Sequence, residues 1–153
     1  RVAILDIDVH HGNGTQAIFY RREDVLTVSI HAHPERFYPF FWGYEGEAGE
    51  GEGIGANLNL PLPRGAEDDT FLAALEAGMQ RISDRGADTL VLALGLDASA
   101  GDPFAGMAVT TAGFGRIGAA VAGLGLPSVI VQEGGYLSPE LGDNLAAVLG
   151  GWQ

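Results

Sequence analysis

Cysteine is absent from this sequence of 153 residues. Without it the chain can form no disulfide bridge, no thiolate zinc finger, no cysteine nucleophile and no thiol redox motif. Any metal ion must therefore be held by histidine and carboxylate side chains. Long apolar runs are also missing, since none approaches the roughly 18 residues that cross a bilayer. We expect a cytoplasmic protein without a membrane partner.

Basic residues are scarce. The chain has 8 Lys and Arg against 20 Asp and Glu, which gives a formal net charge of −12. Because nucleic acids are bound through clustered Lys and Arg, this balance disfavours a nucleic-acid partner. The apolar fraction of 46% is too high for a disordered chain. We expect residues 1–153 to form a single domain, as a chain of this length normally does.

Four short apolar runs predict strands at residues 2–5, 25–30, 89–94 and 128–131. They are rich in Val, Ile and Leu and do not alternate, which is typical of strands buried on both faces of a parallel sheet. Helical spacing of apolar residues follows at 70–85, 110–122 and 139–149. The alternation predicts a three-layer α/β/α fold with a mostly parallel sheet. Residues 37–63, aromatic at first and then rich in Gly and Glu, are predicted to be one long loop.

Polar side chains follow the first and third predicted strands. Asp6, Asp8 and His10 project to one side, because side chains alternate along a strand. Asp97 follows the third strand and is expected at the same carboxyl edge, where open α/β sheets bind ligands. Asp8, His10 and Asp97 would form a three-ligand zinc site with a position left open for water. The alternative is that these residues only cap helices and turns, which is the role we assign to Asp102.

The fourth strand leads into Glu133, Gly134, Gly135 and Tyr136. Paired glycines allow the backbone to turn sharply and approach a substrate, and they bring Tyr136 to the same edge. Its hydroxyl could donate a hydrogen bond to a developing oxyanion. A tyrosine packed under a loop is the alternative interpretation.

Together these motifs resemble the zinc-dependent histone deacetylase superfamily. The resemblance rests on DIDVHHGNGTQ at 6–16, VSIH at 28–31, GLDASAGDP at 95–103 and EGGY at 133–136. The GNGTQ variant and HPERFYPFFWG at 33–43 are most similar to the class II branch and its bacterial acetylpolyamine amidohydrolases. The resemblance implies an arginase/deacetylase-like fold. It also implies an amidohydrolase that removes acetyl groups from polyamines or lysine side chains.

The resemblance also implies a role for particular residues. Zinc would be held by Asp8, His10 and Asp97, with Tyr136 as the oxyanion donor. Substrate would meet Phe37 or Tyr38 as the aromatic tunnel wall, beside Gly134 and Gly135. A structural potassium ion would be held by Asp6, Ser29 and the carbonyls of Asp8, His10 and Ile30. A second monovalent ion would use carbonyls near Phe19, Arg22 and Val25. His11 is expected to be structural because it points away from the ligand face.

One part of the family pattern is missing. The tandem histidine pair that serves the family as general acid and base lies upstream of the first motif, and this chain has only His10, His11, His31 and His33. The sequence also passes directly from Arg1 into an apolar run. We therefore expect the chain to be the C-terminal portion of a deacetylase catalytic domain. Proton transfer by a positioned base contributes about 10²–10⁴-fold, so this portion alone should be feeble or inactive.

Two other functions stay open at this point. A binuclear manganese ureohydrolase has a related fold but would need further His and Asp ligands. A non-catalytic module could keep the metal, bind acylated amines and lack the base. The acidic run at 45–52 is expected to be a solvated loop, with attraction of a cationic amine as the less favoured interpretation. The aromatic residues at 37–44 could instead form a homodimer interface.

Overall fold

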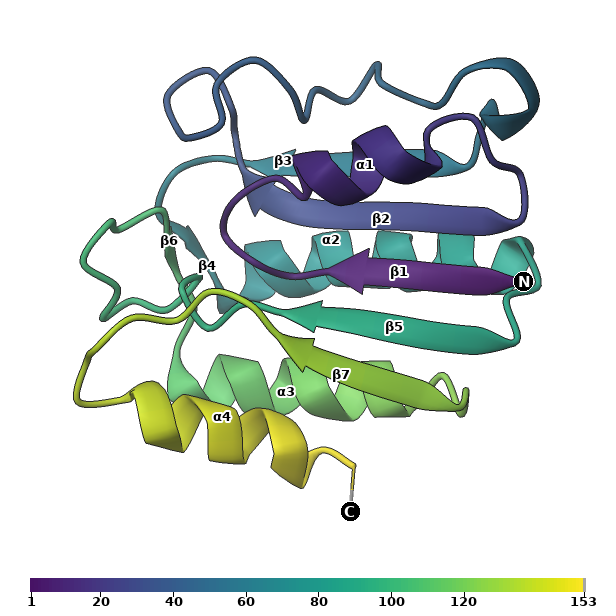
Figure 1. Ribbon diagram of the computed structural model, residues 1–153. Coiled ribbons are helices and arrows are strands. Elements are labelled where there is room, and N and C mark those ends of the chain that lie inside the picture. The colour runs from purple at the N-terminus through teal and green to yellow at the C-terminus, as the bar shows by residue number, and fades with distance from the viewer. Residues whose placement is uncertain (153) are drawn as a thin grey trace.

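The computed structural model describes residues 1–152. Five parallel strands form its central sheet in the order β3-β2-β1-β5-β7. These strands are β1 (Val2–Asp6), β2 (Val25–Ala32), β3 (Asn57–Leu62), β5 (Thr89–Leu94) and β7 (Ser128–Gln132). The helices beside them are α1 (Asn13–Phe19), α2 (Asp68–Asp84), α3 (Thr111–Ala122) and α4 (Leu141–Gly150) (Figure 1). A short pair, β4 (Ala66–Glu67) and β6 (Met107–Ala108), and the 3-10 turn η1 (Gly51–Gly53) lie in the connections.

The structure confirms the predicted α/β fold with a parallel sheet. Each of the four apolar runs forms a strand, and the three helical patterns correspond to α2, α3 and α4. Strand β1 lies between β2 and β5, with Asp6 opposite Ser29 on one side and Ala93 on the other. The carboxyl ends of β1, β2 and β5 therefore meet at one edge of the sheet, as the sequence predicts.

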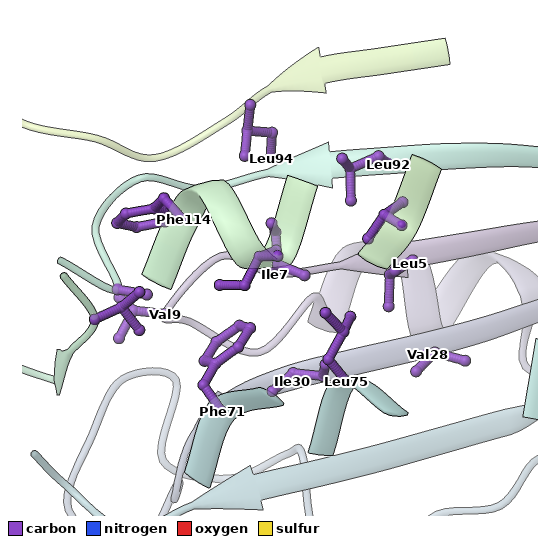
Figure 2. Close-up of a cluster of buried hydrophobic side chains, with 14 of the residues drawn as sticks. Leu5, Ile7, Val9, Val28, Ile30, Phe71, Leu75, Leu92, Leu94 and Phe114 are labelled. Atoms are coloured by element: carbon purple, nitrogen blue, oxygen red, sulfur yellow. The ribbon is translucent and has the colours of Figure 1, made fainter. Parts of the chain in front are cut away.

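One face of the sheet packs against α2 and α3. Leu5 and Leu92 of neighbouring strands lie among Phe71 and Leu75 of α2 and Phe114 of α3, and all five side chains are fully buried (Figure 2). Burial of one such side chain contributes roughly 2 kcal/mol to stability. This core holds β1 and β5 side by side. It thereby fixes the strand ends that are followed by Asp8 and Asp97.

The opposite face is covered unevenly. Helix α1 lies over β2 and β3, whereas no helix of the described residues lies over the same face of β1, β5 and β7 (Figure 1). Register places Val91 beside Val129, and these valines lie on this open face. Val129 is 57% exposed and Val131 42% exposed. Within residues 1–152, the layer on this face thus consists of α1 and the segments that pack around it.

The prediction of one long loop over 37–63 is wrong at its C-terminal end. Residues 57–62 form β3, an edge strand that pairs in parallel with β2, and residues 51–53 form η1. The sequence here alternates polar Asn57 and Asn59 with apolar Leu58 and Leu60, which is the pattern of a strand with two different faces. The Gly-rich and Glu-rich segment before it concealed that pattern. None of the described helices combines the length and apolarity that a membrane span needs.

Candidate metal centre

Side chains from the ends of β1 and β5 meet at the carboxyl edge of the sheet. Asp8, His10 and Asp97 each offer a ligand atom, and these three atoms lie within 4.8 Å of one another. The backbone N–H of Val9 donates to Asp97 Oδ1 at 3.0 Å, which ties the segment after β1 to the segment after β5. The polar residues that sequence analysis placed at this edge are therefore brought together by the fold.

Two glycines leave room for this approach. The N–H of Gly134 donates to Asp8 Oδ2 at 2.9 Å, and a Cβ at Gly134 would collide with the carboxylates of both Asp8 and Asp97. A Cβ at Gly95 would collide with the backbone of Asp8. The backbone after β7 can approach the two carboxylates only because Gly134 carries no side chain, and the backbone after β5 can approach Asp8 only because Gly95 carries none.

The charges at this edge favour a cation. His10 Nδ1 lies 2.9 Å from Asp8 Oδ1 and 3.2 Å from Asp97 Oδ2. Hydrogen bonds to these two carboxylates, opposed by burial, raise the pKa of His10 to about 9. Burial raises the pKa of the Asp97 carboxyl. Burial also acts to raise the pKa of Asp8, but hydrogen bonds from His10 outweigh it, so the pKa of Asp8 is lowered. The directions of these shifts show that the two carboxylates favour a positive charge at this position.

The donor set fits a divalent ion such as zinc. Asp97 is fully buried, and its Oδ2 atom has no aligned hydrogen-bond donor among the described residues. A buried carboxylate oxygen without a donor is costly unless a cation neutralises it. Two carboxylates and one imidazole are also ligands that zinc accepts, with a coordination position left for water or substrate.

Aromatic rings surround His10. The ring of Phe37 lies 5.2 Å from the His10 ring, Tyr38 lies at 6.0 Å and Phe104 at 6.4 Å. Phe104 in turn packs edge-on against Tyr136 at 5.3 Å. Sequence analysis did not single out Phe104, although an aromatic residue directly after the GLDASAGDP motif was the available signal. These rings form walls beside the three candidate ligands.

Tyr136 lies at the same edge, with its ring packed against Phe104. It is 44% exposed. Burial raises the pKa of its phenol, and the negative charges of Asp97, Asp8 and Asp102 raise it further. Gly135 before it has a φ of 137°, a left-handed backbone conformation that favours glycine. The paired glycines thus turn the chain and present Tyr136 beside Phe104.

The turn predicted at Asp102 is present. Asp102 Oδ1 accepts a hydrogen bond at 2.8 Å from the N–H of Phe104, two residues later. Burial raises the pKa of the Asp102 carboxyl, while its hydrogen bond from the Phe104 backbone opposes that rise. Asp102 therefore shapes the backbone that carries Phe104.

Asp6 and Ser29 lie behind the metal centre. Asp6 is 8% exposed, accepts a hydrogen bond at 3.0 Å from the N–H of Asp8, and forms no ion pair with a described residue. Burial raises the pKa of Asp6 to about 8. Ser29 lies opposite Asp6 in β2, followed by Ile30, and both residues are buried. The residues named for a second ion lie at the turn between α1 and β2, where Phe19 O accepts from Arg22 N and Val25 begins β2.

A second cluster of polar side chains lies under α1, which we call the α1 network; its members are His11, Gln16, His31, Glu47, Asn57 and Asn59. His11 Nε2 bonds to Gln16 Oε1 at 2.9 Å, so the ring is directed at α1. His31 Nε2 donates to Gly43 O at 2.8 Å, and its Nδ1 pairs with Ser29 Oγ at 2.9 Å. Sequence analysis quoted His31 within the VSIH motif but gave it no role; that motif and its place directly after a buried apolar run were the available signals.

The prediction that the acidic run at 45–52 is solvated is wrong for one member. Glu47 is half-buried and accepts hydrogen bonds from Gln16 Nε2 at 2.6 Å and Gly43 N at 3.0 Å. Longer bonds come from Tyr44 N and Asn59 Nδ2, both at 3.3 Å. Hydrogen bonds of this kind lower the pKa of Glu47, although burial opposes them. The sequence could not reveal this role of Glu47, because the composition of an acidic run does not show which of its carboxylates is covered by the folded loop.

Comparison with known proteins places this geometry in a family. Residues 1–152 match the model of the histone deacetylase domain. The chain belongs to the histone deacetylase family. The resemblance stated from the four motifs is thereby confirmed.

Two relatives within the histone deacetylase family are acetylpolyamine amidohydrolases by name. That of Burkholderia pseudomallei (strain 1710b) is 48% identical over 152 residues, which are 99% of this chain and 45% of that protein. Acetylpolyamine amidohydrolase 1 of Pseudomonas aeruginosa is 47% identical over 153 residues, which are 100% of this chain and 44% of that protein. The chain thus spans less than half the length of these relatives.

Solved structures of the family share the fold. The crystal structure of acetylpolyamine aminohydrolase from Burkholderia pseudomallei matches with a TM-score of 0.97 at 48% identity, covering 99% of this chain and 44% of that one. The histone deacetylase Clr3 matches with a TM-score of 0.92 at 34% identity, covering 99% and 26%. These matches confirm the deacetylase-like fold that the sequence predicts.

Proposed function

We propose that the protein carrying this chain is a zinc-dependent amidohydrolase that removes acetyl groups from acetylated amines. The observation that supports it most is the meeting of Asp8, His10 and Asp97 within 4.8 Å at the sheet edge. Relatives at 47–48% identity that are named acetylpolyamine amidohydrolases favour polyamines over lysine side chains as the acetylated amine. The net charge of −12 also suits a cationic substrate.

Zinc bound by these three residues would polarise the amide carbonyl and lower the pKa of a bound water. The other steps fall to the chain itself. Tyr136, whose pKa is raised, keeps its proton at neutral pH and donates a hydrogen bond to the carbonyl oxygen as negative charge develops there. Phe37, Tyr38 and Phe104 exclude water beside His10 and hold the apolar part of the acylated amine.

The described residues provide no positioned general base. His11 is directed at Gln16, and His31 is fully buried between Ser29 and Gly43. His33 is exposed and packs against Tyr44. We therefore propose that this chain alone binds zinc and substrate but hydrolyses acetylamines feebly, because a positioned base contributes about 10²–10⁴-fold.

We also propose a monovalent cation such as potassium at Asp6, Ser29 and the Ile30 carbonyl. Burial of Asp6 without a basic partner among residues 1–152 supports it. Such an ion would neutralise the Asp6 carboxylate directly behind the metal centre. Thermal unfolding of the protein in potassium against tetramethylammonium chloride tests it, with a higher midpoint expected in potassium.

The exposed aromatic residues support a homodimer contact. Phe41 is 76% exposed and Trp42 51%, and both lie in the segment that also carries Phe37. Exposed aromatic clusters of this kind are typical of subunit interfaces. Light scattering of the naturally expressed protein, compared with a Phe41→Ser, Trp42→Ser variant, tests this proposal through the molar mass.

The function is tested with the whole protein that carries this chain, loaded with zinc and given N-acetylputrescine and an acetyl-lysine peptide. We expect one zinc per chain, acetate release from N-acetylputrescine, and a loss of kcat of about 10²–10³-fold in Tyr136→Phe with unchanged zinc content. Two manganese ions per chain would favour the ureohydrolase alternative. Binding of acetylated amines without acetate release would favour the non-catalytic module and contradict the proposal.

A further inference from the structure

Phe104 depends on its backbone for its position. Its ring packs edge-on against those of His10 and Tyr136, with centroids 6.4 and 5.3 Å apart, yet the residue is 53% exposed. A side chain with so much free surface is not fixed by packing. What holds the backbone of residues 102–106 therefore determines where this wall of the metal centre stands.

Arg64 holds that backbone from outside. Its Nε donates to the carbonyl of Ala105 at 3.0 Å and its Nη2 to the carbonyl of Phe104 at 3.1 Å. Ala105 has a φ of 49°, a left-handed conformation that is rare for alanine and must be held by its surroundings. A guanidinium donates to two neighbouring acceptors in a fixed plane, which an ammonium group cannot do.

The segment that Arg64 holds also contacts the opposite wall. Gly106 has no space for a Cβ, because Val9 and the Phe37 ring lie against it. This packing and the hydrogen bond from Gly65 N to Gly106 O hold residue 106 without Arg64, so release of residues 104 and 105 would move Phe104 and leave Phe37 in place. The ring that Arg64 influences, Phe104, flanks the candidate metal ligand His10.

The attachment of this segment to the fold does not require Arg64. The N–H of Gly65 donates to Gly106 O at 2.9 Å, and Ala66 pairs with Met107 in the short β4–β6 ladder. Arg64 itself is exposed and buries no apolar core. Loss of its side chain should thus leave the fold intact and release only the carbonyls of Phe104 and Ala105.

We propose that Arg64 is a positioning residue that sets the affinity for the acylated amine by fixing the Phe104 wall. This inference rests on the proposed deacetylase function and extends it. Arg64 touches neither the candidate metal ligands nor Tyr136, so it acts through Phe104. Its effect should appear in KM, because the wall contacts the substrate before and during the reaction.

The test uses the whole protein that carries this chain, loaded with zinc, and N-acetylputrescine as substrate. Four variants are compared with wild type: Arg64→Ala, Arg64→Lys, Phe104→Ala and the double variant Arg64→Ala, Phe104→Ala. Arg116→Ala is the matched control, since Arg116 is also exposed and pairs with Asp69 on the surface. Zinc content and the thermal midpoint are measured for each variant.

We expect Arg64→Ala and Phe104→Ala each to raise KM about tenfold with kcat within about twofold. Arg64→Lys should restore little, and the double variant should match Phe104→Ala alone, because both changes disable the same wall. Additive effects on KM, or an unchanged KM in Arg64→Ala, would overturn the inference. A wild-type protein without acetate release would instead overturn the proposed function, so the two failures are distinguishable.

Discussion

Two histidines of this chain lie only 21 positions apart in sequence and have opposite chemistry. His10 contacts the carboxylates of Asp8 and Asp97, and its pKa is raised to about 9. His31 is fully buried against Ser29 Oγ and Gly43 O, and burial lowers its pKa to about 4. The edge of the sheet therefore attracts a cation, whereas the α1 network keeps an imidazole neutral.

The difference teaches which contacts distinguish a metal centre from a structural polar cluster. At the metal centre Asp97 accepts a hydrogen bond from Val9 N on Oδ1, whereas its buried Oδ2 has no aligned donor. In the α1 network the Glu47 carboxylate is surrounded by donors from Gln16, Gly43, Tyr44 and Asn59. A carboxylate that its neighbours satisfy has little need of an ion; one that they leave unsatisfied binds a proton or a metal.

The sharpest way to break the comparison is to remove the unsatisfied carboxylate. We expect Asp97→Asn to weaken zinc affinity more than about 100-fold, since even loss of a hydrogen bond behind a ligand costs 10–100-fold. The metal-free variant should be about as stable as wild type, because the amide oxygen can still accept from the Val9 N–H and the repulsion between the carboxylates of Asp8 and Asp97 is removed. Zinc titration and urea unfolding without metal measure the two effects. Asp69→Asn, at an exposed position, is the control, and equal zinc affinity in both variants would contradict the assignment.

His31 supplies the next largest effect, on stability against pH. The folded state keeps His31 neutral down to a pKa of about 4, whereas the unfolded chain protonates it near 6.5. The unfolded state therefore binds more protons between these values, and stability falls as pH drops through that window. Keeping His31 neutral thus contributes about 3 kcal/mol to the free energy of unfolding, which is present above pH 6.5 and lost as pH falls toward 4.

Urea unfolding of the metal-free protein across pH 4–7 measures this term. Because glutamine cannot titrate, the free energy of unfolding of His31→Gln should depend on pH less steeply than that of wild type. The difference in slope should correspond to at most one bound proton. His11, which packs 4.7 Å from His31 and whose pKa is also lowered by burial, contributes with the same sign in both proteins. Parallel curves for wild type and variant would show that His31 is protonated in the fold.

Sequence reasoning predicted the fold and the metal edge for the same physical reason. Val, Ile and Leu runs can hide both faces only in the middle of a parallel sheet, and polar residues directly after such runs must lie at its carboxyl edge. Asp8, His10 and Asp97 could be placed together without knowledge of any loop. The assignment of zinc to them is still a prediction.

The parts that the sequence did not reveal depend on contacts between distant segments. Strand β3 was hidden by a Gly-rich and Glu-rich lead-in, and its role emerges only where Asn57 and Asn59 meet Gln16 of α1. Arg64 and Phe104 are 40 positions apart, and no local pattern links a surface arginine to a carbonyl across the fold. Such pairs follow from the three-dimensional path of the chain and not from periodicity.

The smallest expected effect separates Glu47 from its neighbours in the same acidic run. Glu47→Gln can keep an oxygen on the donors Gln16 and Gly43, but it then turns an NH₂ group toward the Tyr44 N–H and removes the charge, so we expect a loss of about 1–2 kcal/mol in the free energy of unfolding. Glu45→Gln, two residues earlier at an exposed position, should change it by less than about 0.5 kcal/mol. Urea unfolding of both variants measures the difference. Equal stability of the two variants would mean that Glu47 is as solvated as Glu45. The hydrogen bonds from Gly43 and Tyr44 to the Glu47 carboxylate would then contribute nothing to stability.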